Sequence, residues 1–264
     1  MRKIKIYQVD AFTDKLFSGN PAAVCILESW LSDDLMQSIA NENNLAETAF
    51  VVPEGDDFFI RWFTPSVEVD LCGHATLASA YVIFNMTGYK AQQIRFHSMK
   101  SGLLTVSRKE DILFLDFPSD VLLTSDEDKP LIEKCIGIRP IEVYKGKTDY
   151  LAVVDNETAV RNLVPNLNEI NRLNARGLIV TAEGDDADFV SRFFAPQSGV
   201  DEDPVTGSAH TSLIPFWWSK KGRMNMKALQ LSKRGGNILC EYRNDRCIIG
   251  GKAKLYLTGE INTA

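Results

Sequence analysis

The sequence has little that would point to a membrane or to export. No apolar run reaches the roughly 18 residues that a membrane-spanning helix needs. Residues 1–9 alternate polar and apolar side chains, as a strand does, and contain no apolar core of about 7–15 residues as in a signal peptide. We therefore expect a cytoplasmic protein that does not contact the membrane.

Metal-binding and disulfide patterns are missing as well. The five cysteines form an odd set without a CxxC pair or a zinc-type spacing, and they stand at positions 25, 72, 135, 240 and 247. The three histidines are scattered along the chain, at positions 74, 97 and 210. This pattern predicts reduced thiols and no metal centre.

Basic residues are also too few to suggest a nucleic-acid partner. The formal net charge is −6, spread along the chain, whereas a nucleic-acid-binding protein needs a basic face. The hydrophobic content of 45% and the charged content of 24% are ordinary for a globular protein with a core. We expect no nucleic-acid partner.

What the sequence does contain is a long internal repeat. Residues 61–72 (RWFTPSVEVDLC) reappear without a gap as residues 192–203 (RFFAPQSGVDED), 131 positions later in a chain of 264 residues. Arg, Phe, Pro, Val and Asp are identical at five positions. The period is far longer than the 20–50 residues of a solenoid repeat. It indicates a duplicated domain and predicts one site lined by both copies.

The pattern of short segments predicts an α+β fold. Each half contains many strand-like segments and one main helix, which begins near residue 73 in the first half and near residue 205 in the second. Residues 117–130 are polar and acidic and are interpreted as the linker. We predict two similar domains, 1–117 and 118–264, each a curled, mostly antiparallel sheet around a central helix. The last strand could return to the first domain.

Small residues mark both helix starts. Gly73 and Ala75 stand at the first, and Gly207 and Ser208 at the second. The first turn of a helix presents unpaired N–H groups and a partial positive charge, and small residues let a carboxylate approach them. The alternative is that these residues only allow close packing of helix and sheet.

The two copies differ where chemistry is expected. In the ungapped match Cys72 corresponds to Asp203, and His74 adds a group that can carry a proton near pH 7. We predict a functional role for His74, whereas a lone cysteine is more often a small buried apolar residue. Asp203 is expected to cap the second helix, to contact the substrate, or both.

Glu47 is the third candidate, at the start of the apolar strand that follows a helix. A partly buried carboxylate there would have a raised pKa and could shuttle a proton. Aligning the two halves places Arg176 or Gly177 opposite Glu47, so the second half has no counterpart carboxylate. The alternative is a solvated loop carboxylate.

Together these motifs resemble the PhzF family, the phenazine-biosynthesis isomerase-like proteins that share their fold with diaminopimelate epimerase. The resemblance covers essentially the whole chain and rests on five segments in the family's order. They are residues 10–13 (DAFT) with 19–22 (GNPA), 46–51 (AETAFV), 72–76 (CGHAT) and 201–209 (DEDPVTGSA).

The resemblance implies a cofactor-independent, homodimeric isomerase that binds a small acidic substrate in a cleft between its two domains. It implies that Glu47 takes a proton from one carbon and returns it to another, with His74 and Asp203 as catalytic partners. The expected substrate-binding residues are Asn20, Gly73, Gly207 and Ser208.

The chain departs from related proteins at two places. The epimerases carry a catalytic cysteine at each helix start, whereas this chain has one only at Cys72, which excludes a two-thiol mechanism. Ala46 stands where the family often has Ser, which bears on the substrate. Two other functions stay open: a Cys72-dependent epimerase or hydrolase, although Cys72 and His74 are expected to be poorly placed to pair, and a non-catalytic protein that binds a small acid.

Overall fold

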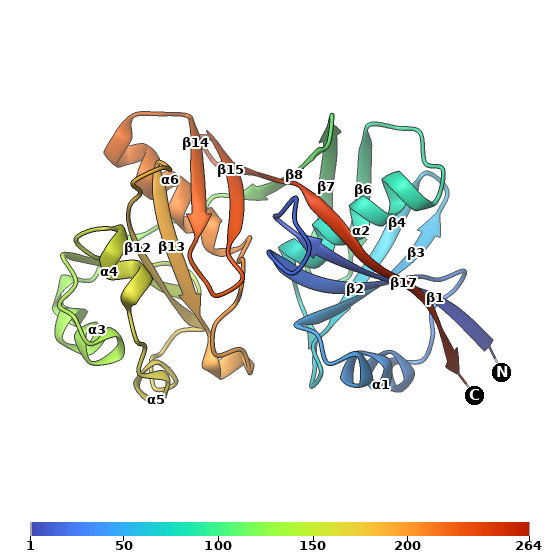
Figure 1. Ribbon diagram of the computed structural model, residues 1–264, viewed down its shortest axis with the longest axis horizontal. Coiled ribbons are helices and arrows are strands. Elements are labelled where there is room, and N and C mark those ends of the chain that lie inside the picture. Colours follow the sequence, from blue (N-terminus) through green and yellow to red (C-terminus); the bar gives the residue numbers. More distant parts are fainter. Residues whose placement is uncertain (1, 264) are drawn as a thin grey trace. The chain divides into compact units, whose positions relative to one another are not determined.

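The computed structural model describes residues 2–263, and the chain divides into two compact units (Figure 1). Unit 1 extends to Asp116 and also includes the stretch from Gly250 onward, while unit 2 comprises Phe117–Ile249. The last strand, β17 (Ala253–Thr263), therefore belongs to unit 1, where it pairs antiparallel with β1 (Arg2–Ala11). No helix within residues 2–263 is long and apolar enough to cross a membrane.

Unit 1 is a mixed sheet with two helices. Its first elements after β1 are β2 (Asn20–Ile26), α1 (Asp33–Asn43), β3 (Glu47–Glu54), β4 (Asp57–Phe63) and β5 (Glu68–Val69). The chain continues through α2 (Gly73–Met86), β6 (Gln93–Ser98), β7 (Gly102–Lys109) and β8 (Ile112–Pro118). Helix α1 begins at Asp33, because the hydroxyl of Ser32 accepts the N–H of Leu35 and two aspartates stand in the first turn.

Unit 2 has shorter helices before its main one. It begins with β9 (Leu123–Thr124), a 3-10 turn η1 (Asp126–Asp128), α3 (Lys129–Ile136), β10 (Glu142–Lys145), β11 (Asp149–Val153), α4 (Glu157–Asn162) and α5 (Leu167–Ile170). It continues with β12 (Gly177–Glu183), β13 (Phe189–Phe194), a 3-10 turn η2 (Pro196–Ser198), α6 (Ala209–Lys221), β14 (Asn225–Gln230), β15 (Gly236–Arg243) and β16 (Arg246–Gly251).

The two sheets repeat one order of strands and one pattern of directions. In unit 1, β1 and β2 are antiparallel, β2 and β3 parallel, β3 and β4 antiparallel, β4 and β6 parallel, and β6 and β7 antiparallel. Unit 2 repeats this with β10, β11, β12, β13, β14 and β15. The sequence repeat covers only 12 residues, but the duplication includes six strands of each unit. The α+β class with mostly antiparallel pairing is confirmed.

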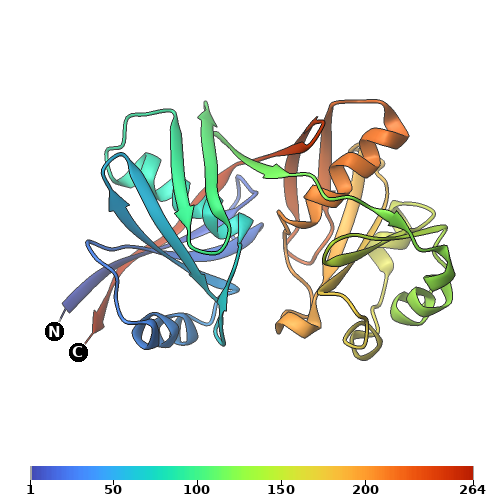
Figure 2. The same cartoon turned by 180° about the vertical axis from the view of Figure 1, so that it is seen from behind.

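The main helix of each unit is the crossover between two parallel strands. Helix α2 joins β4 to β6, and α6 joins β13 to β14, because parallel neighbours need a long connection. Eleven residues of α2 are buried, so it is apolar on nearly all sides. Helix α6 lies toward the viewer in Figure 2, and its Trp217 donates an indole hydrogen bond to Thr181 of β12.

Pro215 stands inside α6 without breaking it. Proline has no N–H, so the carbonyl of Thr211, one turn earlier, loses its helical donor. The backbone N–H of Asp120 donates to this carbonyl at 3.1 Å instead. A residue nearly a hundred positions away in the sequence thus replaces the missing hydrogen bond.

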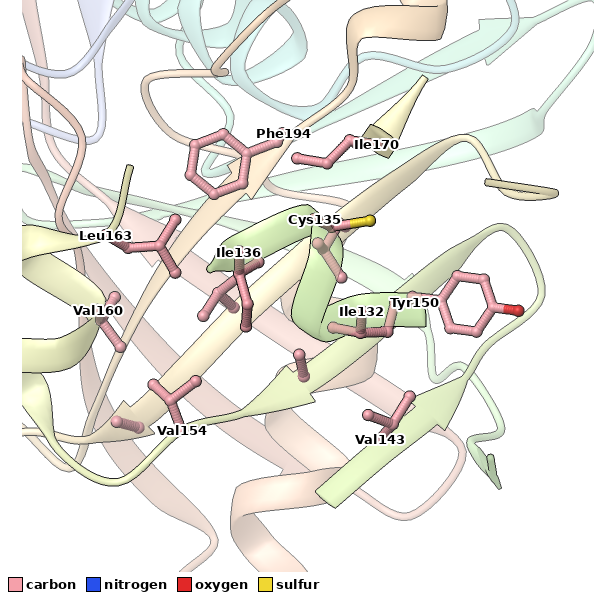
Figure 3. Close-up of a cluster of buried hydrophobic side chains, with 14 of the residues drawn as sticks. Ile132, Cys135, Ile136, Val143, Tyr150, Val154, Val160, Leu163, Ile170 and Phe194 are labelled. Atoms are coloured by element: carbon pink, nitrogen blue, oxygen red, sulfur yellow. The ribbon is translucent and has the colours of Figure 1, made fainter. Parts of the chain in front are cut away.

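Each unit has its own apolar core. In unit 1, Met36 and Ile39 of α1 pack with Phe50 and Cys25 of the sheet. In unit 2, α3 contributes Ile132, Cys135 and Ile136 to a cluster that also includes Tyr150, Val160 and Phe194 (Figure 3). The last turn of α3 ends at Gly137 in the left-handed conformation, which glycine adopts without strain.

Helix α3 corrects one part of the sequence interpretation. Residues 117–130 are predicted to be a plain linker, yet they include β9 and η1 and run into α3. The polar, acidic composition hides these elements because they are short and because no residue of β9 or η1 is buried. Helix α6 also begins at Ala209, a few residues later than predicted, because Gly207 and Ser208 form a turn ahead of it.

Candidate active site

Glu47 and His74 lie side by side in unit 1. Glu47 is the first residue of β3, and His74 lies in the first turn of α2. The Nε2 atom of His74 is 3.0 Å from Oε2 of Glu47, and the exposed fractions of the two side chains are 5% and 15%. Among the residues that the structure describes, none donates an aligned hydrogen bond to this carboxylate oxygen. This oxygen therefore has the His74 ring as its polar neighbour, with which it can share a proton.

Two further residues, Asn20 and Cys72, contact His74. The side-chain amide nitrogen of Asn20, at the start of β2, lies 3.1 Å from Nδ1 of His74. The amide nitrogen can donate to the neutral ring, and after a 180° turn the amide oxygen can accept from the charged ring. Asn20 therefore orients the imidazole in either protonation state.

Cys72 lies closer to His74 than the sequence suggests. Its Sγ atom is 3.5 Å from Nδ1 of His74, so the expectation that the two are poorly placed to pair is wrong. Burial and the neighbouring Glu47 carboxylate nevertheless raise the pKa of the Cys72 thiol to about 11. A thiol with this pKa is almost entirely neutral near pH 7, which makes it a poor nucleophile.

The charge on His74 is set by opposing effects. Burial alone lowers the pKa of His74, but the Glu47 carboxylate and the hydrogen bonds with Cys72 and Glu47 raise it, and the net effect places it well above its ordinary value. The pair can therefore hold a proton on the ring beside an ionised carboxylate. Such a pair can accept a proton at Glu47 and stabilise negative charge on a bound molecule through His74.

Gly73 opens α2, and its helix start is suited to an anion. The first turn of α2 contains no acidic residue, and its N-cap, Cys72, makes no side-chain cap. The partial positive charge of the helix start is therefore not neutralised by α2 itself. Gly73, Asn20, Glu47 and His74 are the four predicted site residues that the structure brings together in unit 1.

The three other predicted residues lie in unit 2. The carboxylate of Asp203 accepts a hydrogen bond from the hydroxyl of Thr206 at 2.5 Å, and Gly207 follows directly. The hydroxyl of Ser208 lies 3.0 Å from the guanidinium of Arg176. The N-cap of α6 is Ser208, so the prediction that Asp203 caps this helix is wrong.

The structure changes how the two copies correspond. Arg61 binds Glu68 through both carboxylate oxygens, and Arg192 binds Glu202 in the same way. These partners are 7 positions apart in unit 1 (68 − 61) and 10 in unit 2 (202 − 192), so unit 2 has three extra residues in the turn. With this shift Cys72 corresponds to Thr206, and the ungapped match to Asp203 is wrong. Gly73 and His74 then correspond to Gly207 and Ser208.

The absence of a counterpart to Glu47 is confirmed by strand register. Phe50 pairs with Arg61 in unit 1 and Val180 with Arg192 in unit 2, which places Gly177 opposite Glu47. A Cβ atom added at Gly177 would lie 2.6 Å from the ring of Phe193, so no side chain fits there without a shift. Unit 2 therefore cannot present a carboxylate at this position.

The sequence points to Arg176 only as a possible counterpart of Glu47, and it does not point to the partner of Arg176, Asp149, at all. Both oxygens of the Asp149 carboxylate accept hydrogen bonds from Arg176, which also contacts Ser208. Since Ser208 corresponds to His74, unit 2 has an arginine–serine contact where unit 1 has the glutamate–histidine contact. Arg176 and Asp149 are 27 positions apart, and only the parallel pairing of β11 with β12 brings them together.

His210 is a buried histidine of unit 2 whose pKa differs from its ordinary value. It is fully buried, its Nδ1 atom lies 2.8 Å from the carbonyl oxygen of Thr206, and its ring packs against Phe189. Burial lowers the pKa of His210 to about 4, and the contact with Thr206 only partly opposes this. The ring is therefore neutral in the folded protein at neutral pH.

We expect this histidine to make unit 2 sensitive to acid. The unfolded chain binds the proton at about pH 6.5 and the folded chain only near 4, so the stabilisation is complete above pH 6.5 and is lost as the pH falls towards 4. The loss amounts to about 3 kcal/mol for this shift. His210→Asn can still donate to Thr206 without titrating, so urea unfolding from pH 7 to pH 4.5 should show a smaller decline. An equal decline in both proteins would contradict the assignment.

Comparison with known proteins extends these observations. A family model described as "Phenazine biosynthesis-like protein" matches residues 9–259. An uncharacterized isomerase of Pseudomonas aeruginosa is 48% identical over 263 residues, which covers 98% of both chains. The crystal structure of a phenazine biosynthesis protein of the PhzF family from Enterococcus faecalis superposes with a TM-score of 0.92 at 44% identity, covering 99% of this chain and 100% of that one.

A more distant structure shows how widely the fold occurs. A hydroxyproline epimerase from Agrobacterium vitis superposes with a TM-score of 0.63 at 13% identity, covering 98% of this chain and 92% of that one. The duplicated fold and the relatives together define this protein as an isomerase. It belongs to the PhzC-PhzF family of phenazine biosynthesis-like proteins.

Proposed function

We propose that the protein is a cofactor-independent isomerase that moves a proton between two carbons of a small carboxylate-bearing substrate. Glu47 is the acid/base: it takes the proton from one carbon and returns it to the other. The single observation that supports this best is the Oε2 atom of Glu47, which is buried beside His74 and has no aligned donor within the described residues.

His74 assists by stabilising the charge that develops when the proton leaves. The charged ring would stabilise an enol-like oxygen of the substrate, and the start of α2 would add its partial positive charge. Asn20 holds the ring while this happens, since its amide contacts Nδ1. Oriented donors of this kind change rates by about 10²–10³-fold.

Unit 2 is proposed to contribute substrate contacts rather than a second base. Gly177 leaves no room for a side chain opposite Glu47, so within residues 2–263 unit 1 alone presents a carboxylate at this position. Asp203, Gly207 and Ser208 surround the start of α6 and are proposed to bind polar groups of the substrate. The homodimer implied by the resemblance stays a prediction.

A Cys72-dependent epimerase or hydrolase is the alternative that the geometry allows, since Sγ lies within reach of His74. The raised pKa of the thiol argues against it, because little thiolate forms near neutral pH. A protein that only binds small acids is the other alternative. It would not need a carboxylate oxygen that lacks a donor beside a histidine.

Solvent deuterium distinguishes the three functions. The protein is incubated in D₂O with a panel of small unsaturated and amino-substituted carboxylic acids, and carbon-bound deuterium is measured by NMR and mass spectrometry. We expect incorporation with the wild type and with Cys72→Ser, because Glu47 carries the proton. Loss of incorporation in Cys72→Ser would favour the thiol mechanism, and no incorporation from any acid that binds would favour a binding protein.

A further inference from the structure

Besides the role proposed for Glu47 and His74 in proton transfer, the side chains of Glu47, Cys72 and His74 could together bind a metal ion. Each offers one ligand atom, and these three atoms lie within 4.8 Å of one another. The set combines a thiol, an imidazole and a carboxylate, which are the three protein ligands that Zn²⁺ uses. We propose that Glu47, Cys72 and His74 bind one Zn²⁺ ion, and that the bound ion blocks the isomerase.

The distances are close to those of a tetrahedral site. Bonds of 2.0–2.3 Å to one zinc ion place neighbouring ligand atoms about 3.3–3.6 Å apart. Nε2 of His74 is 3.0 Å from Oε2 of Glu47 and 4.0 Å from Sγ of Cys72. Sγ of Cys72 lies closer to Nδ1 of His74, at 3.5 Å, than to Nε2, so the Cys72 side chain would move toward Nε2 and Glu47 to bring all three atoms around one ion.

The surroundings also suit a bound metal. The other ring nitrogen, Nδ1, faces the amide of Asn20, and such a partner on the second nitrogen is typical of metal-bound histidines. Cys72 and His74 are buried, and Glu47 is more exposed, so an ion would arrive from the Glu47 side and keep a fourth position for water. Mg²⁺ and Ca²⁺ are disfavoured because only one oxygen ligand is present.

Charge balance explains why the ion would be tolerated in a buried place. Binding forms one Zn–S, one Zn–N and one Zn–O bond, and both the thiol proton and the proton held on the His74 ring are released to the solvent. No electron is transferred. The two negative ligands, thiolate and carboxylate, then neutralise the two positive charges of the ion. The buried site has no net charge, which limits the desolvation cost.

The inhibitory effect rests on the proposed function, whereas the binding does not. A metal on Oε2 occupies the lone pair that would accept the substrate proton, and it also ties down His74. Both parts of the proposed proton transfer would stop until the ion is removed. The protein would thus be active without zinc and inactive with it.

Cobalt gives a direct test, because Co²⁺ replaces Zn²⁺ and reports its ligands by absorption. Metal-stripped full-length protein is titrated with Co²⁺. We expect one equivalent to produce the visible bands of a tetrahedral ion and a thiolate-to-cobalt band in the near ultraviolet, both removed by Zn²⁺. Cys72→Ala should lose the thiolate band, and Glu47→Gln should keep it with affinity weakened by roughly tenfold or more.

Cys25→Ala is the matched control, because Cys25 is an equally buried thiol of unit 1 whose pKa is raised by burial alone. It should keep the full spectrum. A wild-type spectrum without a thiolate band, or a band that survives in Cys72→Ala, would overturn the proposal. If deuterium incorporation is absent in the wild type but the thiolate band appears, the proposed function fails and the metal site stands. If both are present, zinc should stop incorporation in the wild type and not in Cys72→Ala.

Discussion

Replacing Glu47 with glutamine is expected to lower the rate of deuterium incorporation by about 10²–10⁴-fold, the usual contribution of a positioned acid/base. The amide has nearly the same shape as the carboxylate but cannot take up a proton. The substitution leaves the size of the side chain beside His74 unchanged, so the fold should be retained. The rate is measured on any substrate that exchanges with the wild type.

The control for this change lies on the same strand. Glu54 is the last residue of β3 and is exposed, whereas Glu47 is the first. Glu54→Gln removes the same charge from the same element at a distance from His74. It should leave the rate within twofold, because surface changes of this kind usually alter stability by less than about 0.5 kcal/mol. A Glu47→Gln protein as active as Glu54→Gln would exclude Glu47 as the base.

Gly19→Ala is expected to have the largest effect on stability, about 3 kcal/mol or more. Gly19 has a φ of +66°, and an added Cβ would lie 2.1 Å from the carbonyl oxygen of Ala11 and 2.7 Å from Thr13. The left-handed conformation alone costs an alanine about 1–2 kcal/mol. The clash with backbone adds to this, because it forces apart the paired residues Ala11 and Asn20.

The Gly55→Ala variant distinguishes the cost of the steric clash at Gly19 from the cost of the left-handed backbone conformation. Gly55 has a similar φ of +60°, but an added Cβ would meet no atom within 4 Å. It should therefore cost only the conformational part, about 1–2 kcal/mol. Urea midpoints of the two variants give the difference directly. Equal midpoints would show that the turn at Gly19 relaxes without moving Ala11.

Gly19→Ala should also reduce activity through Asn20. A shift where β1 ends and β2 begins would move the Asn20 amide that contacts Nδ1 of His74. Deuterium incorporation measured well below the urea midpoint should therefore fall in Gly19→Ala and stay normal in Gly55→Ala. This outcome would tie the turn to the orientation of the imidazole.

The sequence predicted most of the architecture because its patterns are local. Alternating strands, the cap at Ser32 and the small residues at Gly73 and Gly207 can be recognised without knowing any partner. The family and the isomerase class could also be predicted, since the motifs at residues 46–51 and 72–76 stand in a recognisable order. Helix α3 was missed because eight residues with one apolar face carry a weak signal.

The correspondence between the two halves needed long-range contacts. An ungapped match paired Cys72 with Asp203, and only the two arginine–glutamate pairs show that unit 2 has three extra residues. Similarly, the alignment left Arg176 and Gly177 as alternatives opposite Glu47, and strand register selects Gly177. A shift of one residue in register moves every side chain to the other face of the sheet, so an alignment that is uncertain by one position cannot decide between the two residues.

The sequence by itself determined the duplicated α+β fold, the family, and a short set of candidates that included Glu47 and His74. The tertiary structure decided how those candidates act on one another. Asn20, Glu47 and His74 come from three separate elements, and only the parallel pairing of β2 with β3 beside the start of α2 brings their side chains into contact. Protonation depends on burial and on neighbouring charge, so the neutral thiol of Cys72 and the raised pKa of His74 follow from this packing and not from the residue types alone.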